Sequence, residues 1–326
     1  MSFLGGGTDY PPFFREHGGS VISTTFNKYC YVNIRHTPRF LEHRNQVTYS
    51  RIERTKSVAE IGHPMVRNTL LYLGMEELSI NYDADLPARS GLGSSSSFSV
   101  GLLNALHALR DEYVGKHALA EEAVHVERDL CRESGGWQDQ IAVAYGGLNR
   151  INFAGDSFTV RPVRIGRPRK ERLENNLMLF FTGFSRLSSE IAAEQVKSIK
   201  NKTAELLELL ELVDEGERIL TDDGRDLDEF GRLLHHTWQI KRGITRRVST
   251  DTLDEIYARA LKNGALGGKL LGAGGGGFFL FYVRQQDRSR LQSALSQFLY
   301  VPLAFEDNGS EILYYQPESV EEETTK

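Results

Sequence analysis

The sequence has few cysteines, no strong excess of charge of either sign and no long hydrophobic run. Its two cysteines, Cys30 and Cys131, are too few in 326 residues for the disulfide framework of a secreted domain. A net charge of −5 and a pI of about 6.0 provide no basic field for nucleic acid or an anionic membrane. No apolar run approaches the roughly 18 residues of a membrane span, and the start MSFLGGGTDY has no signal-peptide pattern. These absences predict a soluble cytoplasmic protein without nucleic-acid or membrane partners.

Two common nucleotide-binding signatures are missing as well. The Walker pattern G-x-x-x-x-G-K-[ST] does not occur, which excludes that class of P-loop enzyme. Gly272, Gly274 and Gly277 spell G-x-G-x-x-G, but the strand-like FFLFYV follows them. A dinucleotide fingerprint must open a helix instead, so a dehydrogenase is not expected.

Glycine is abundant, with 31 residues, and much of it lies in three clusters. These clusters are residues 5–7, the stretch RSGLGSSSSF at 89–98, and residues 272–277 within KLLGAGGGGFFLFYV. Each adjoins a strongly apolar segment, which favours an ordered loop over a flexible polar linker. A Gly/Ser loop before a helix offers free backbone N–H groups to a phosphate. The spacing alone leaves phosphate binding and a plain helix start with spare serines equally open.

Hydrophobic periodicity predicts an α+β chain in two lobes, with a boundary near residues 165–180. Strands are expected at residues 21–35, 46–52, 78–87, 146–153, 176–184 and 277–283. Helices are expected after the serine run and at about residues 116–132, 188–220, 226–242, 252–262 and 287–299. The helix after the serines has an apolar stripe of Phe98, Leu102, Leu106 and Leu109. The acidic end PESVEEETTK is expected to be disordered.

Three motifs resemble, in order, those of the GHMP small-molecule kinases, which include galactokinase, homoserine kinase and mevalonate kinase. FLGGGTDYP (residues 3–11) is similar to their N-terminal motif, LPARSGLGSSSSFSVGLLNAL (86–106) to their phosphate-binding motif, and KLLGAGGGGF (269–278) to their C-terminal glycine motif. The resemblance covers nearly the whole chain. It implies the two-lobed GHMP kinase fold, with a mixed α/β ATP-binding lobe at residues 1–170, a helix-plus-sheet lobe at 171–316 and a disordered tail at 317–326.

Within this family, GGGTDY and GGWQDQ resemble the sugar kinases, above all those for D-glycero-D-manno-heptose 7-phosphate. That resemblance implies an ATP-dependent phosphotransferase that acts on the anomeric hydroxyl and yields the 1,7-bisphosphate for nucleotide-activated heptose and surface polysaccharide. Fucokinases are similar too, so a kinase for fucose or another free sugar stays open. A catalytically silent sugar- and ATP-binding sensor stays open as well. The chain would be a monomer or a homodimer.

The resemblance assigns ATP to the glycine loops and Mg²⁺ to one serine and one glutamate. The ATP-binding set would be Arg89, Ser90, Gly91, Leu92, Gly93, Ser94, Ser95, Ser96, Ser97, Gly274 and Gly275. The metal ligands would be Ser95 and Glu127, both hard oxygen donors that suit Mg²⁺. Glu127 follows Ala123 by four residues and precedes Leu130 by three, at the edge of the buried helix face. The alternative for Glu127 is a surface glutamate paired with a neighbouring base.

The resemblance also implies a catalytic and a sugar-binding aspartate. Asp139, in GGWQDQ, would accept the proton of the sugar hydroxyl or orient that hydroxyl. Asp9, in GGGTDY, would accept hydrogen bonds from vicinal hydroxyls, with Thr8, Gly7, Gly136 and Gln138 completing the sugar site. The alternatives are a loop aspartate bonded to its own backbone and a turn residue before a proline.

A cation for the transferring phosphoryl group is harder to assign. The resembling sugar kinases carry an arginine a few residues before GGGTD, whereas this sequence begins at Met1, four residues before Gly5. Either the natural reading frame starts upstream, or that arginine and a strand are missing. Lys28, in FNKYCYV, is the alternative catalytic cation, unless it is simply an exposed strand lysine.

A sugar that already carries a phosphate needs a second basic pocket. Arg15, Arg186 and the pair Lys241 and Arg242 are the candidates for it. The adjacent histidines of LLHHTW are not a metal pair, because neighbouring helix residues point about 100° apart.

Overall fold

The structure is a computed structural model that describes residues 1–87, 90–183, 188–244 and 248–316. The strands of these residues form three four-stranded sheets and one two-stranded sheet. In spatial order, the first sheet contains β1 (Ser2–Leu4), β2 (Gly19–Ser23), β8 (Asn149–Ala154) and β9 (Ser157–Pro162), and the second contains β4 (Cys30–His36), β7 (Leu78–Ala84), β5 (Asn45–Thr48) and β6 (Ile52–Thr55). The third sheet contains β11 (Ala265–Leu270), β12 (Gly277–Val283), β10 (Leu177–Gly183) and β13 (Leu299–Val301). The two-stranded sheet pairs β14 (Phe305–Glu306) with β3 (Thr25–Phe26). β5 and β7 pair in parallel, whereas the other pairs are antiparallel.

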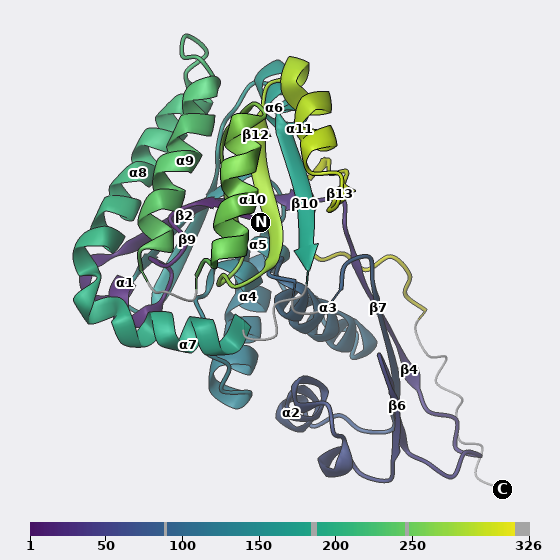
Figure 1. The fold of residues 1–326 in the computed structure, drawn as a ribbon. Helices are drawn as coiled ribbons and strands as arrows, with labels where there is room; N and C mark the ends of the chain where they lie inside the picture. Colours follow the sequence, from purple (N-terminus) through teal and green to yellow (C-terminus); the bar gives the residue numbers. More distant parts are fainter. Residues whose placement is uncertain (88–89, 184–187, 245–247, 317–326) are drawn as a thin grey trace, which may run out of the picture.

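Helices pack against these sheets, and α2 and α3 lie on one side of the sheet that contains β4, β6 and β7 (Figure 1). In the first half they are α1 (Pro11–His17), α2 (Pro64–Leu73), α3 (Ser94–Leu109), α4 (Lys116–His125), a π-helix (Val126–Leu130) and α5 (Gln138–Tyr145). In the second half they are α6 (Arg167–Asn175), α7 (Ser188–Ser198), α8 (Thr203–Thr221), α9 (Asp228–Arg242), α10 (Asp251–Lys262) and α11 (Arg288–Ala294). Short 3₁₀ turns occur at Val58–Glu60, Ile199–Asn201 and Gln285–Asp287. None of the helices described combines the length and the apolar character that crossing a membrane requires.

The predicted α+β class is confirmed, and the apolar stripe after the serine run is the buried face of α3. Phe98, Leu102 and Leu106 are at most 5% exposed. They share one core with residues of α2 and β7, such as Val66 and Ile80. Burial of this stripe fixes how α3 is rotated about its axis, and that rotation decides which of the preceding serines face inward.

The apolar run GFFLFYV is strand β12, and all seven of its residues are buried. Phe279 and Phe281 belong to a core with Trp238 of α9, whereas alternate residues such as Leu280 and Tyr282 belong to a different core. The two side-chain directions of a strand explain the split, because the sheet is covered on both faces. A continuous apolar run, without polar alternation, is what such a strand requires.

Several predicted elements divide in the structure. The strand expected at residues 21–35 is wrong as one element, because β2, β3 and β4 belong to three different sheets. The helix expected at 188–220 is α7 and α8 with a 3₁₀ turn between them. The helix expected at 116–132 leaves α-geometry at Val126 and continues as the π-helix. Asp139, expected in a loop, lies in the first turn of α5.

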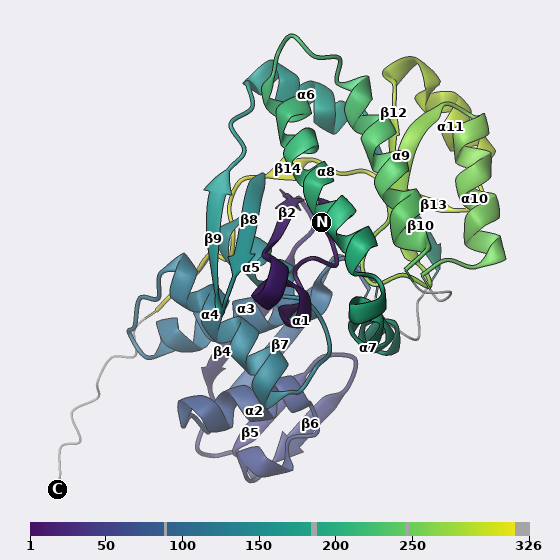
Figure 2. The same ribbon diagram turned by 90° about the vertical axis from the view of Figure 1, so that its left-hand side faces the viewer.

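The two lobes share a core around the first strand. Phe3, Leu4 and Ile22 of the first sheet pack in one cluster with Phe230 and Leu280 of the C-terminal lobe. Figure 2 shows the start of the chain near α8 and the first sheet. The domain ranges 1–170 and 171–316 stay a prediction, and the tail 317–326 lies outside the described residues.

We expect Gly267→Ala to destabilise the C-terminal lobe, because α9 and β11 touch backbone to backbone there. An added Cβ would lie 2.0 Å from the carbonyl oxygen of Gly231, and a Cβ on Gly231 would lie 2.6 Å from the ring of Tyr282. The free energy of unfolding should fall by about 2 kcal/mol or more. Urea unfolding measures it, with the m-value as a check on two-state behaviour.

Gly115→Ala is the matched control, since a Cβ there meets nothing within 4 Å. It should change the free energy of unfolding by less than about 1 kcal/mol. Equal decreases in the free energy of unfolding in both variants would contradict the interpretation that α9 and β11 are in backbone contact at Gly267.

Candidate active site

Two glycine loops from distant parts of the sequence cross backbone to backbone. A Cβ on Gly91 would lie 2.7 Å from the carbonyl oxygen of Leu271, and one on Gly277 would lie 2.2 Å from that of Ser90. Gly91 and Gly272 also have φ of 81° and 76°, which disfavours other residues. The second and third glycine clusters therefore form one interlocked structure. In the same loop, Gly275 donates its N–H to the carbonyl of Val248, 3.1 Å away, and Gly274 has φ of 115°.

The crossing holds the N-terminus of α3 beside the C-terminal glycine loop. Gly93 is the N-cap of α3 in the left-handed region, and no side chain caps the helix. Ser90 is fully buried, and among the described residues its hydroxyl has no hydrogen-bond partner. Open N–H groups at a helix N-terminus, beside an unpartnered hydroxyl, suit a phosphate. Arg89, which was predicted to join this set, lies outside the described residues.

Glu127 is buried, at 1% exposure, and faces serine hydroxyls of α3. The Ser99 hydroxyl donates to Oε1 at 2.6 Å, and the Ser96 hydroxyl to Oε2 at 3.4 Å. Burial raises the pKa of this carboxyl, against the opposing charge of Arg128. Ser95, the predicted metal partner of Glu127, is exposed instead. The buried stripe turns Ser96 and Ser99 inward, because residues three apart share a helix face and their neighbours do not.

The donor set around Glu127 fits a magnesium ion that arrives with nucleotide phosphates. A carboxylate and hydroxyls are hard oxygen donors, and Mg²⁺ in phosphoryl-transfer sites takes one or two carboxylates plus phosphate oxygens and waters. Across the described residues, no group of three or more His, Cys, Asp or Glu side chains could hold a metal by itself. The site is therefore suited to an ion shared with a substrate.

Asp9 is buried, at 2% exposure, between the first glycine loop and the GGWQDQ segment. Its Oδ1 accepts from Gly7 N–H at 2.9 Å and its Oδ2 from Gln138 N–H at 3.3 Å. Burial is the main reason why its pKa is raised, and the charge of Asp139 adds to the effect. A Cβ on Gly136 would lie 1.7 Å from Oδ2, so only glycine fits there.

Two other predicted sugar-site residues, Thr8 and Gln138, lie near the first glycine loop and have different roles. Thr8 is fully buried, and its hydroxyl lies 2.8 Å from the carbonyl of Gly5 and 3.0 Å from that of Ser20, which share its one proton, so it holds the loop together. The side-chain oxygen of Gln138 is buried and has no hydrogen-bond partner in the part of the chain that the structure describes, and Gln138 lines the cavity described next.

Asp139 lines a cavity at the junction of all these segments. The cavity is lined by Met1, Ser2, Gly6, Gly91, Leu92, Gln138, Asp139, Lys241, Lys269, Leu271 and Gly272. A Cβ on Gly93, at the N-terminus of α3, would lie 3.4 Å from Cγ of Asp139. The carboxylate is thus placed between the predicted nucleotide loops and the predicted sugar loop.

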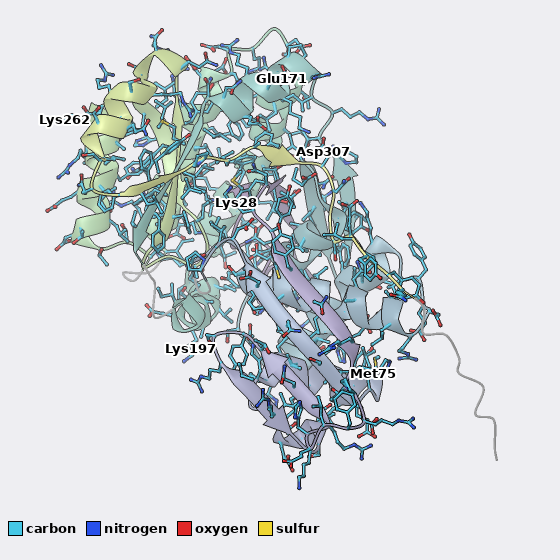
Figure 3. All side chains as sticks on the ribbon, turned by 90° about the vertical axis from the view of Figure 1, so that its right-hand side faces the viewer. Lys28, Met75, Glu171, Lys197, Lys262 and Asp307 are labelled. Carbon is cyan, nitrogen blue, oxygen red and sulfur yellow. The ribbon has the colours of Figure 1, made fainter. Side chains whose placement is uncertain are left out.

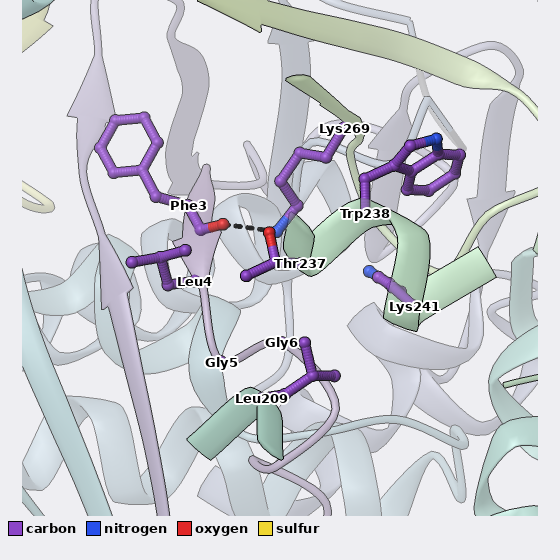
Figure 4. Close-up of a pocket in the computed structure, with 9 residues that line it drawn as sticks. All are labelled: Phe3, Leu4, Gly5, Gly6, Leu209, Thr237, Trp238, Lys241 and Lys269. Carbon is purple, nitrogen blue, oxygen red and sulfur yellow. Dashed lines mark hydrogen bonds between the residues drawn. The ribbon is translucent and has the colours of Figure 1, made fainter. Parts of the chain in front are cut away.

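Among the described residues, the lysines that line this cavity are Lys241 and Lys269, and both also line a second pocket, which Figure 4 shows. Lys28, the predicted catalytic cation, does not line it. Its ammonium group donates to the carbonyl of Asn27 at 3.2 Å, on the connection between β3 and β4 (Figure 3). The lysine in the apolar stretch ALGGKLL was a signal for Lys269, because a strand buried on both faces seldom holds an unpaired lysine.

The basic residues predicted to form a second phosphate pocket do not gather in one place in the described structure. Arg15 pairs with Asp156 at 2.7 Å, and Arg242 pairs with Asp254 at 2.6 Å. Arg186 lies outside the described residues. Of the described candidates, Lys241 lines the cavity.

Arg128, which none of the sequence motifs singled out, connects the Glu127 site to the Asp9 site. Its guanidinium donates to the carbonyls of Gly136 at 2.8 Å and Glu133 at 3.2 Å, and lies 3.7 Å from Glu127. The bonded carbonyl thus belongs to the glycine that packs against Asp9. The ER dipeptide at 127–128 was a weak signal, because most arginines are solvated.

Comparisons with known families identify two domains in the chain. Residues 56–147 match the family model described as the GHMP kinases N terminal domain, and residues 207–301 match the GHMP kinases C terminal model. The chain is 28% identical over 309 residues to a D-glycero-alpha-D-manno-heptose 7-phosphate kinase of Campylobacter jejuni, covering 90% of each chain. It is 25% identical to a bifunctional fucokinase/GDP-fucose pyrophosphorylase of Arabidopsis thaliana, over 89% of this chain and 30% of the relative.

A solved structure has the same fold over nearly the whole chain. It is a D-glycero-D-manno-heptose 1-phosphate kinase from Bacteroides thetaiotaomicron, with a TM-score of 0.69, 26% identity, and coverage of 95% of this chain and 94% of the other. A mevalonate kinase structure aligns with a TM-score of 0.72 at 21% identity, over 94% and 97% of the two chains, which shows the fold alone.

We expect Glu127→Gln to raise the midpoint of thermal unfolding of the ligand-free protein at pH 8. The folded-state pKa of Glu127 is raised by burial. Its stabilising contribution is therefore complete below the unfolded-state pKa and is lost as the pH rises through the folded-state value. The advantage of the glutamine variant should shrink as the pH falls towards 5. The amide oxygen can still accept from Ser99.

Scanning calorimetry from pH 5 to pH 8 measures this difference. Glu211→Gln, at an exposed position on α8, is the control and should show no such pH dependence. A midpoint for Glu127→Gln at or below that of the native protein at pH 8 would contradict the expectation that burying the charged Glu127 carboxylate destabilises the ligand-free protein.

Proposed function

Because the chain belongs to the GHMP kinase family and is a sugar kinase that transfers phosphate to a hydroxyl, we propose that its acceptor is D-glycero-D-manno-heptose 7-phosphate. The product would be the 1,7-bisphosphate, formed at the anomeric hydroxyl. The reaction would supply nucleotide-activated heptose for surface polysaccharide.

One observation carries the proposal: Asp139 lies where the glycine loops that we assign to the nucleotide meet the loop that we assign to the acceptor. It lines one cavity with Gly91 and Gly272 of the crossed glycine loops and with Gly6 of the first motif. A phosphoryl group bound at the N-terminus of α3 would thus lie next to a carboxylate that faces the acceptor. Phosphoryl transfer needs this positioning more than it needs covalent chemistry from the protein.

We assign each group at the site one role in phosphoryl transfer. Asp9, held by the N–H groups of Gly7 and Gln138, would accept hydrogen bonds from sugar hydroxyls. Asp139 would orient the attacking hydroxyl and take its proton late in the reaction, as the new O–P bond forms and the bond to the ADP oxygen breaks. The open N–H groups of α3 would hold the phosphates.

Kinases of this family use ATP, and we assign Mg²⁺ to Glu127 with the neighbouring serines. Ser96 and Ser99 contact the Glu127 carboxylate, while Ser95, exposed at the same helix start, stays a predicted ligand. The ion, when bound, neutralises charge on the phosphates.

The heptose reading is supported by the heptose kinase relatives, which are 28% and 26% identical over at least 90% of this chain. The fucokinase relative keeps a free sugar as the second candidate. Coupled measurement of ADP release with Mg·ATP separates them on a panel of heptose 7-phosphate, unphosphorylated heptose, mannose, fucose and galactose. Turnover with the 7-phosphate alone is the expected result. Preference for a free sugar would move the enzyme to the fucokinase-like branch, and binding without turnover would indicate a sensor.

Asp139→Asn should lower kcat by at least about 100-fold, because the amide cannot accept the proton. ATP affinity should stay within about threefold of the native value, since the nucleotide loops are untouched. ADP release measured at fixed time points gives kcat, and equilibrium binding measurements give the ATP affinity. Asp223→Asn, on an exposed turn, is the matched control. Near-normal turnover in Asp139→Asn would remove this aspartate from the mechanism.

A further inference from the structure

Lys241 reaches into the cavity from the last turn of α9, in the C-terminal lobe. Its ammonium group donates to the carbonyl of Gly272 at 2.9 Å. The same nitrogen lies 3.8 Å from the position that a Cβ on Gly6 would take, and the side-chain nitrogen of Gln138 lies 3.9 Å from that position. One charged group therefore adjoins both the C-terminal glycine loop and the acceptor loop.

The second cavity lysine, Lys269, is placed differently. It is 5% exposed, and its ammonium group donates to the carbonyl of Phe3 at 3.0 Å (Figure 4). Lys241 is less buried and lies at the Gly272 side. Burial lowers the pKa of both lysines, and the charges of Asp9 and Asp139 oppose that effect.

We propose that Lys241 is a catalytic residue whose ammonium group contacts the phosphoryl group during its transfer from nucleotide to acceptor. The proposal rests on the proposed function only in requiring a nucleotide at the glycine loops and an acceptor at Asp139. Lys241 lines the same cavity as Asp139 and both glycine loops, so a group that passes from one to the other would lie near its ammonium group. An ammonium group has three donors, and the Gly272 carbonyl accepts one of them.

The chemistry of the step favours a fixed cation at this place. The acceptor oxygen forms a bond to phosphorus, the bond from phosphorus to the ADP oxygen breaks, and the acceptor proton goes to Asp139. Lys241 keeps its protons throughout and donates hydrogen bonds to the phosphoryl oxygens. A preorganised donor in a partly desolvated cavity stabilises such charge more than water does.

The position argues against the other role open to Lys241, binding of the acceptor's own phosphate. The 7-phosphate is at the far end of the sugar from the anomeric hydroxyl. Lys241 instead shares its cavity with Asp139, the residue next to the reacting hydroxyl. A ligand for the remote phosphate would have to lie away from that carboxylate.

The first test needs no sugar. We expect Lys241→Met to weaken binding of Mg·ADP·aluminium fluoride, which imitates the transferring phosphoryl group, by at least about tenfold, while Mg·ADP affinity stays within about threefold. Lys241→Arg should regain part of the loss. Lys262→Met removes an exposed lysine at the periphery of the neighbouring helix and should match the native protein (Figure 3). Equal affinity of Lys241→Met and native protein for the analogue would overturn the proposal.

The second test separates catalysis from acceptor binding, using any acceptor on the panel that the native enzyme phosphorylates. Lys241→Met should lower kcat at least about 100-fold, with little change in KM, for phosphorylated and free sugars alike. A raised KM confined to phosphorylated sugars, with kcat kept, would overturn the proposal in favour of an acceptor-phosphate site. The native enzyme could fail to phosphorylate heptose 7-phosphate while Lys241→Met still weakens binding of the aluminium fluoride analogue. That result would overturn the proposed acceptor but support the catalytic role of Lys241.

Chemical rescue distinguishes a lost charge from a damaged fold. Lys241→Cys treated with 2-bromoethylamine regains an ammonium group of nearly the original length. The native cysteines should react slowly, because burial raises the pKa of the Cys30 thiol to about 12 and also raises that of Cys131. We expect at least tenfold recovery of analogue binding, and none in treated Lys262→Cys. Full alkylation by mass spectrometry without recovery would refute the charge role.

Discussion

The crossing of the two glycine loops is the contact on which the site depends. Ser90 and Gly91 precede α3, and Gly272 and Gly277 border β12, so the crossing joins the two lobes at the point of chemistry. The separations would not admit a side chain, and positive φ angles remove most alternatives. Because backbone meets backbone, the N-terminus of α3 has a fixed place relative to Lys241 and Asp139.

The site concentrates charges that the ligand-free protein holds at a cost. Burial raises the pKa values of Asp9 and Glu127 and lowers those of Lys241 and Lys269. Each shift marks a charged form that the folded protein solvates less well than water does. Nucleotide, metal and sugar would supply the missing partners, so ligand binding and stability should be coupled. Active sites commonly carry such strain, which the large cores on either side offset.

Arg128 gives the site a second internal link. Its guanidinium lies beside the Glu127 carboxylate and holds the carbonyl of Gly136, the residue that packs on Asp9. The metal carboxylate and the sugar carboxylate are thus connected through one side chain. The π-helix that carries Glu127 and Arg128 departs from α-geometry at this point, as short π segments often do at functional sites.

The fold class, the family and the glycine motifs follow from the amino-acid sequence, because apolar periodicity and loop chemistry are local properties. The stripe of α3 and the buried run of β12 could be read directly. Tertiary structure alone decided which serines face Glu127, because the rotation of α3 follows from burial of Phe98 and its neighbours against other elements. It likewise decided that Lys241 and Lys269, rather than Lys28, line the cavity with Asp139, since these residues come from separate elements and meet only through long-range packing.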